Sequence, residues 1–254
     1  MAEVVAPDVR FRDKPGAWVD LGLTLPVFLV YHLGVVFLGV KNATDFVTSW
    51  LLRACEGNVP MYLGATLVIG GVFAAAFAVA GRGQAFHPRK FIQIGVEGVI
   101  YAISMAVISS YVVGHVFAGP SAIATSGPFV GLVMSMGAGF YEELTFRAIL
   151  FGLGAKVLVW LLSKEKMMLA GQAGPAPGMT LRSMVVMVTW ALVCAVVFSG
   201  VHYVGSLSDA FEIRSFTFRM LLGLALTLIF VTRGFAAAVW THALYDVWVM
   251  VFHR

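Results

Sequence analysis

Two adjacent glutamates and an arginine, Glu142, Glu143 and Arg147, interrupt a long apolar run of the sequence. Glu143 and Arg147 are four residues apart, so on a helix they lie on one face and can form an ion pair. Glu142 points about 100° away from Glu143 on an α-helix, so the two carboxylates are not expected to meet at one place. A buried carboxylate with no local cation is a candidate general base. The alternative for Glu142 is a hydrogen bond that packs its helix against a neighbour.

Two further pairs of residues at helical spacing contain histidine. Phe198 precedes His202 by four residues, and His242 precedes Asp246 by the same spacing. The Asp246 carboxylate can therefore orient or charge the His242 ring, and histidine exchanges protons near neutral pH. Either histidine alone could be a hydrogen-bonded packing residue. Three polar clusters in separate apolar runs instead favour one site built from inward-facing side chains of several helices. Gly200, between Phe198 and His202, is expected to let another helix approach closely.

The background composition makes these clusters informative. Of the 254 residues, 60% are apolar and only 12% are charged, and the mean hydropathy is +0.90. A soluble domain of this length could not bury so much apolar surface, and the composition also excludes a disordered or collagen-like chain. Although the net charge is +4, no basic recognition helix is present, so we expect no nucleic-acid partner. Cys55 and Cys194 have neither zinc-ligand nor disulfide spacing.

The apolar runs predict an all-α fold, a polytopic helical bundle of about seven transmembrane helices (six to eight), in one integral-membrane domain over residues 1–254. A helix that crosses a bilayer needs about 20 apolar residues. The runs that meet this requirement are Trp18–Val40, Met61–Ala80, Phe91–Phe117, Phe129–Leu162, Met184–Val204, Phe216–Thr232 and Phe235–Phe252. The fourth run exceeds the membrane thickness and is expected to break, tilt or project, with Gly137 and Gly139 as its weak points.

The segments between these runs predict how the protein is oriented in the membrane. Residues 42–58 carry apolar side chains at helical spacing and suggest a helix lying in the membrane interface. An amino terminus on the inside puts most basic residues on the inner face, as the positive-inside rule requires. The inner set is Arg10, Arg12, Lys14, Arg82, Arg89, Lys90, Lys156, Lys164, Lys166, Arg182 and Arg233, and the outer set is Lys41, Arg53, Arg214, Arg219 and Arg254.

Other polar residues within the apolar runs are expected to be structural. Glu97 is a fourth carboxylate in a predicted span, close enough to the span's start to reach the interface. His32 has no carboxylate three or four residues away and looks like a packing residue. Cys194 lies on the face of His202, but no nearby base is spaced to activate it.

The three clusters, in this order and each in an apolar run, resemble the three motifs of the CPBP family (CAAX protease and bacteriocin-processing) of intramembrane glutamic endopeptidases, which is related to the CAAX prenyl proteases. The motifs as they stand here are Glu142-Glu143-x-x-x-Arg147, Phe198-x-x-x-His202 and His242-x-x-x-Asp246. The resemblance covers residues 139–246 and makes residues 129–252 the expected catalytic core.

The resemblance implies a metal-independent peptidase without a cofactor. Glu142 and His202 would activate a water, while His242 with Asp246 would stabilise the oxyanion, and Glu143, Arg147 and Phe198 would support them. Family members have Asn or Asp at position 246; with Asp, we expect this residue to keep His242 protonated and oriented. Expected partners are membrane lipid and a peptide or protein with a transmembrane or lipidated carboxyl terminus, in a bacterial inner membrane.

Two other functions remain open from the residues alone. A non-enzymatic transporter or immunity-type membrane protein could use the buried glutamate and histidines as a proton relay. A zinc-dependent membrane protease could in principle ligate the metal with Glu142, His202 and His242, although no His-Glu-x-x-His motif exists.

Overall fold

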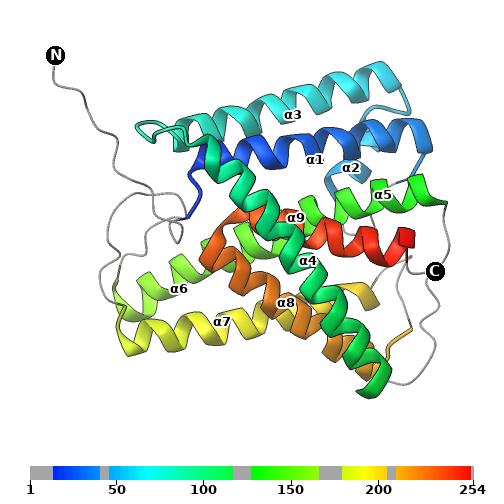
Figure 1. The fold of residues 1–254 in the computed structure, drawn as a ribbon. Coiled ribbons are helices and arrows are strands. Elements are labelled where there is room, and N and C mark those ends of the chain that lie inside the picture. Colours follow the sequence, from blue (N-terminus) through cyan, green and yellow to red (C-terminus); the bar gives the residue numbers. More distant parts are fainter. Residues whose placement is uncertain (1–13, 41–45, 117–126, 166–178, 205–209, 253–254) are drawn as a thin grey trace, which may run out of the picture.

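The computed structural model describes residues 14–40, 46–116, 127–165, 179–204 and 210–252. Every regular element in these ranges is a helix (Figure 1). The elements are α1 Ala17–Leu38, α2 Phe46–Ala54, α3 Val59–Ala80, α4 Pro88–Val116, α5 Pro128–Gly137, η1 Ala138–Leu153, α6 Gly154–Ser163, α7 Leu181–Gly200, η2 Val201–Tyr203, α8 Ile213–Arg233, α9 Phe235–Val247 and η3 Trp248–Phe252. Of the basic residues used to predict the orientation, Arg10, Arg12, Lys41, Lys166 and Arg254 lie outside the described residues.

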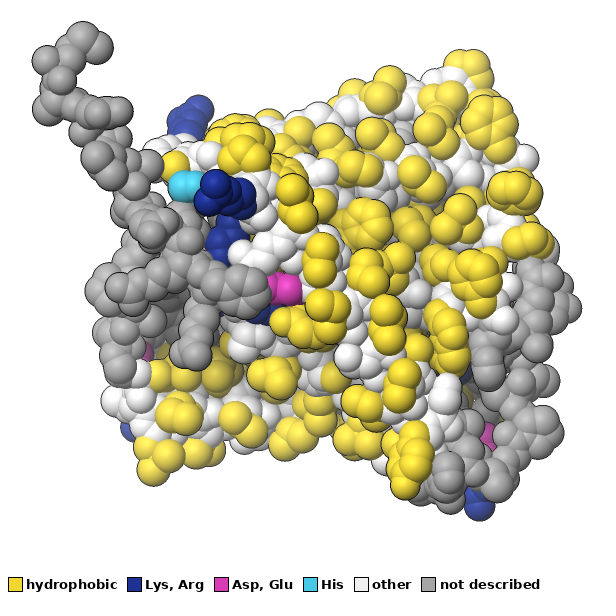
Figure 2. All heavy atoms as spheres, in the orientation of Figure 1, with side chains coloured by type: hydrophobic (Ala, Val, Ile, Leu, Met, Phe, Trp, Pro, Cys, Tyr) yellow, Lys and Arg dark blue, Asp and Glu magenta, His cyan; other side chains and the backbone are white. Residues whose placement is uncertain are grey.

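Seven helical segments are long and apolar enough to cross a membrane, which confirms the prediction of about seven spans. Hydrophobic side chains cover most of the face shown in Figure 2, and the Lys and Arg side chains on it lie toward the two ends of the helices. Such a surface suits lipid along its middle and water at its ends. The protein is a multi-pass integral membrane protein of α-helices.

The fourth span is continuous, so of the three predicted outcomes, a break, a tilt or a projection, the break does not occur. It runs from Pro128 to Ser163 through α5, η1 and α6. Gly137 is the last residue of α5, and from Ala138 the helix continues in π-helical turns. Such turns hold more residues than α-helical turns because their hydrogen bonds join residues five apart. The long run therefore changes its helix type after Gly137 but does not break.

The last span, α9, is the central helix of the bundle (Figure 1). It packs against α4, η1, α8, α5 and α1. Three consecutive alanines near its start, Ala236, Ala237 and Ala238, are fully buried. Small side chains let neighbouring helices approach closely, which explains how one helix can contact so many others.

A glycine turn and one polar contact hold the start of α9. Gly234 joins α8 to α9 with φ +92°, a left-handed conformation that favours glycine. The Asp20 carboxylate on α1 accepts a hydrogen bond of 2.8 Å from the backbone N–H of Ala236. That N–H has no partner within its own helix, so Asp20 caps α9 from a different span.

Glu97 on α4 forms a buried ion pair with Arg233 at the end of α8. Arg233 donates from Nε and a terminal nitrogen to the two carboxylate oxygens, at 2.6 and 2.8 Å. Gln93 donates a further hydrogen bond of 2.7 Å to Glu97. This is the structural role expected of Glu97, because the charge is paired inside the bundle.

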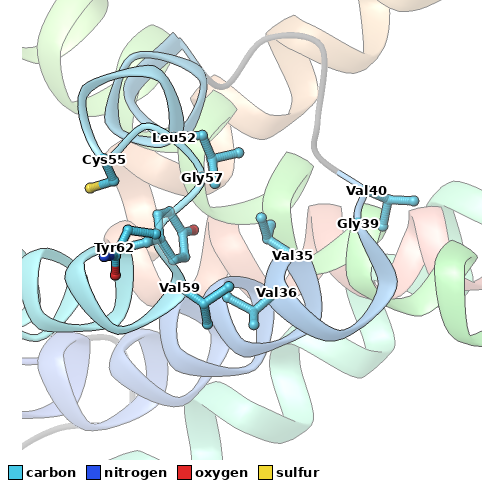
Figure 3. Close-up of a pocket in the computed structure, with 10 residues that line it drawn as sticks. Val35, Val36, Gly39, Val40, Leu52, Cys55, Gly57, Val59 and Tyr62 are labelled. Carbon is cyan, nitrogen blue, oxygen red and sulfur yellow. The ribbon is translucent and has the colours of Figure 1, made fainter.

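A cavity of about 370 Å³ lies between the end of α1, α2 and the start of α3 (Figure 3). Its walls are mainly apolar, and Tyr62 contributes its ring from α3. The short helix α2 covers one side, with Leu51 buried and Trp50 exposed. This two-sided character agrees with a helix that lies along the surface of the bundle.

Candidate active site

The three polar clusters of the sequence meet between η1, the α7–η2 junction and α9. Glu142, in η1, lies with Oε2 4.0 Å from Nε2 of His202 and 3.9 Å from Nε2 of His242. The Glu142 carboxylate is buried, whereas the His202 side chain is 24% exposed. One carboxylate thus faces two imidazoles that come from two other helices, and the group is accessible on the His202 side.

Glu143 also reaches His242, which differs from the expectation that the two glutamates face different places. Nδ1–H of His242 donates a 2.7 Å hydrogen bond to Oε1 of Glu143. Glu142 and Glu143 therefore contact opposite edges of one imidazole ring. The π-helical turns of η1 bring consecutive side chains closer together around the helix axis, and the two ring nitrogens lie on opposite sides.

The predicted ion pair between Glu143 and Arg147 is present, with 3.0 Å between NH1 and Oε1. Both side chains are buried, at 0% and 1% exposed. Arg147 also lies with its Cζ 4.1 Å from the centre of the Phe198 ring. A buried guanidinium in contact with a carboxylate and an aromatic face has its charge compensated on two sides.

Asp246 is near His242 but is not its closest partner. Its Oδ2 is 3.5 Å from Nε2 of His242, on the edge of the ring that Glu142 also faces. The sequence predicts that Asp246 orients His242. In the structure, His242 donates its short hydrogen bond to Glu143 on another helix. Spacing within one helix could not indicate this contact.

His202 is oriented by its own helix. Its Nδ1 is 2.9 Å from the carbonyl oxygen of Phe198. A carbonyl only accepts hydrogen bonds, so Nδ1 carries the hydrogen, and in the neutral ring Nε2 has the free lone pair. That nitrogen is the one that faces Glu142.

Phe198 packs at the centre of the group. Its ring makes edge-to-face contacts with Phe146, His202 and His242, at centroid distances of 5.3, 5.4 and 6.2 Å. Such contacts fix the relative orientation of aromatic rings. Phe198 therefore links the two histidines through packing, and all seven site residues predicted from the sequence lie together.

Close approach of η1 and α9 depends on Gly139. A Cβ atom at this position would lie 2.6 Å from Cβ of Ala243 and 2.9 Å from the carbonyl oxygen of Val239. Gly200 does not have the expected similar role, because a Cβ there would meet no described atom within 4 Å. Gly200 is the last residue of α7, and it lies outside the contact between neighbouring helices.

His32 has polar partners that its sequence neighbours do not reveal. It hydrogen-bonds Tyr62 and Tyr141, and Tyr141 directly precedes Glu142. Both cysteines are free and buried, as packing residues would be. Among the described residues, no three His, Cys, Asp or Glu side chains converge as metal ligands do.

Comparison with known proteins gives a family match over the part of the chain that carries the three clusters. Residues 124–248 match the model of the family described as type II CAAX prenyl endopeptidase, Rce1-like. The matched range contains every residue of the three clusters. No solved structure matches the chain.

Proposed function

The chain belongs to the family of Rce1-like type II CAAX prenyl endopeptidases, and on this premise we propose that it is an intramembrane glutamic peptidase that uses Glu142 to activate water. That it is a peptide hydrolase of the CAAX protease family in a membrane follows from the family itself. The observation that carries the glutamic mechanism is the position of the Glu142 carboxylate between Nε2 of His202 and Nε2 of His242.

In the proposed first step, a water between Glu142 and His202 attacks the scissile carbonyl carbon. Carboxylate and imidazole nitrogen are 4.0 Å apart, a separation at which one water can hydrogen-bond both groups. The water gives its proton to Glu142 as the new C–O bond forms. His202, with its hydrogen on Nδ1, contributes the Nε2 lone pair to orient this water.

His242 stabilises the tetrahedral intermediate in this proposal. Its Nδ1–H is committed to Glu143, so Nε2–H of the protonated ring is the donor to the oxyanion. Asp246 lies beside that nitrogen and supports the protonated ring. When the intermediate collapses, the C–N bond breaks and the proton held by Glu142 passes to the leaving amine, which restores the ionised carboxylate.

The proposed substrates are membrane-associated proteins cut near a lipidated or transmembrane carboxyl terminus. The family description points to carboxyl-terminal CAAX sequences, whose cysteine carries a prenyl group. The bundle has an apolar outer surface, so such an anchor can reach the site through the lipid. We place the protein in a bacterial inner membrane with its amino terminus inside, which would direct the His202 side of the site outward.

The decisive test compares Glu142→Gln with the wild-type protein on a quenched fluorescent peptide that ends in S-farnesyl-cysteine-Val-Ile-Met. We expect kcat to fall by about 10²–10⁴-fold, the usual contribution of a general base. His202→Ala is expected to lose cleavage as well. The matched control is Glu56→Gln, which changes an exposed glutamate outside the spans and leaves kcat unchanged.

Full activity of purified, folded Glu142→Gln would falsify the glutamic mechanism. Activity that a chelator removes and Zn²⁺ restores would support the zinc protease instead. Substrates are identified by comparing membrane-protein carboxyl termini in cells that carry wild-type or Glu142→Gln protein. Processed termini that are missing only with the variant are the products of this enzyme.

A further inference from the structure

His32 joins three helices through two short hydrogen bonds. It lies on α1, with Nδ1 2.7 Å from the Tyr62 hydroxyl of α3 and Nε2 2.6 Å from the Tyr141 hydroxyl of η1. The three side chains are only 1%, 1% and 4% exposed, respectively. We refer to Tyr62, His32 and Tyr141 as the tyrosine clamp.

The chemistry of imidazole suits this position. A neutral ring has one nitrogen that donates and one that accepts, and a tyrosine hydroxyl can do either. His32 therefore bonds both hydroxyls at once, whichever nitrogen holds the hydrogen. A phenylalanine at this position would fill a similar space but would leave both buried hydroxyls without this partner.

The clamp acts on the helix that carries the carboxylates. Tyr141 is the residue before Glu142, so a rotation of η1 about its axis moves both side chains together. The opposite side of η1 is held by the bond of Glu143 to His242 on α9 and by the contact of Arg147 with the Phe198 ring on α7. The clamp is thus a polar attachment of η1 on the α1 and α3 side, next to the ring contacts of Phe140 with Phe28 and Phe73.

The outer end of the clamp lies beside a cavity. The ring of Tyr62 borders the cavity between α1, α2 and α3, so one side of it has open space (Figure 3). The ring of Tyr141, by contrast, packs edge-to-face on Tyr31 and Phe140. The two bonds of His32 therefore connect the ring beside the cavity to η1.

We propose that His32 is a positioning residue that, through Tyr141, fixes the rotation of η1 and so directs the Glu142 carboxylate between His202 and His242. This inference rests on the proposed function, in which Glu142 activates the water. His32 itself touches no reacting atom, so its effect should appear in kcat and not in substrate binding.

The test measures kcat and KM for His32→Phe, Tyr141→Phe and the double variant on the farnesylated peptide. Each single variant is expected to lower kcat at least about tenfold with KM within about twofold, because a misplacement of reacting groups by 1 Å can cost about 10²-fold. The double variant is expected to have the same kcat as the less active of the two single variants, because both changes break the same connection. His32→Gln, which keeps a donor and an acceptor, should recover part of the activity.

Thr24→Val is the matched control. Thr24 is fully buried on the same helix, and its hydroxyl bonds only the carbonyl of Asp20 within α1 in the contacts described. Hydrogen–deuterium exchange provides a readout that does not depend on cleavage: exchange across residues 138–147 should rise in His32→Phe and not in Thr24→Val. If His32→Phe does not fold, Tyr141→Phe alone carries the test, because it removes a single oxygen.

Wild-type kcat in folded Tyr141→Phe, losses that multiply in the double variant, or an equal loss in Thr24→Val would overturn the role of the clamp. These outcomes are distinct from failure of the glutamic mechanism. That mechanism fails if Glu142→Gln stays active, whereas the exchange measurement still reports whether the clamp holds η1.

Discussion

The His242 ring is surrounded by three carboxylates that differ in distance and in the ring edge they approach. Glu143 accepts a hydrogen bond of 2.7 Å from Nδ1–H, while Asp246 and Glu142 lie 3.5 and 3.9 Å from Nε2. Orientation of the ring is thus assured by Glu143 without Asp246. Asp246 can still act on Nε2 of His242, the nitrogen that donates to the oxyanion in the proposed mechanism.

Asp246→Asn is therefore expected to retain partial activity, with kcat reduced no more than about tenfold. An amide has a similar size, and its N–H₂ group can itself donate to the oxyanion. His242→Ala, which removes the donor, should lose about 10²–10³-fold. The measurement is kcat of both purified variants on the farnesylated peptide. An Asp246→Asn variant as inactive as His242→Ala would mean that the negative charge of Asp246 is required.

How much of this site the sequence predicts depends on whether a contact lies within one helix or between helices. The pairs Glu143–Arg147, Phe198–His202 and His242–Asp246 follow from spacing alone. The Glu143–His242 bond and the partners of His32 lie 99, 30 and 109 residues apart in the chain. No periodicity encodes such contacts, because they arise only when the helices pack.

At the scale of elements, the positions of the seven spans are predictable because apolar length alone decides them. The π-helical turns of η1 are not predictable, since the apolar pattern of residues 138–153 is compatible with either kind of turn. These turns matter for the site, because they bring Glu142 and Glu143 to the same histidine. The contact of η1 with α9 is the second requirement, and it depends on the missing side chain of Gly139.

Gly139→Ala is expected to lower kcat by about tenfold or more. The added methyl would meet backbone atoms of α9, and overpacking of this kind typically costs about 1–3 kcal/mol. Relief by separation of the two helices would lengthen the Glu143–His242 bond. Gly71→Ala is the matched control, because a Cβ there meets nothing within 4 Å. Equal activity of the two alanine variants would contradict the requirement for close approach.

At the scale of the whole molecule, the buried ion pair Glu97–Arg233 ties α4 to the end of α8, immediately before α9. A pair of this kind adds little stability compared with apolar residues of equal size, but loss of one partner leaves a buried charge. Asp20 caps α9 at the same end of the bundle. The position of the central helix is thus fixed by polar contacts at its start, away from Glu142 and the two histidines.

Glu97→Gln is expected to destabilise the protein by about 3–5 kcal/mol, because Arg233 stays buried without its ionic partner. The measurement is thermal unfolding in detergent, with Glu56→Gln as the control for loss of an exposed glutamate. A double variant, Glu97→Leu with Arg233→Met, should recover most of the loss, since neither charge remains. An unchanged unfolding temperature in Glu97→Gln would show that the ion pair does not stabilise the folded protein.

The central place of α9 has a consequence for how the protein is made. The helix around which the bundle packs follows all six other described spans in the chain, and its cap comes from Asp20, 216 residues earlier. During synthesis the earlier spans must enter the membrane before α9, the helix that they pack against, has been made. His242 lies on that helix, so under the proposed mechanism a nascent chain cannot cleave a substrate before α9 has been synthesised.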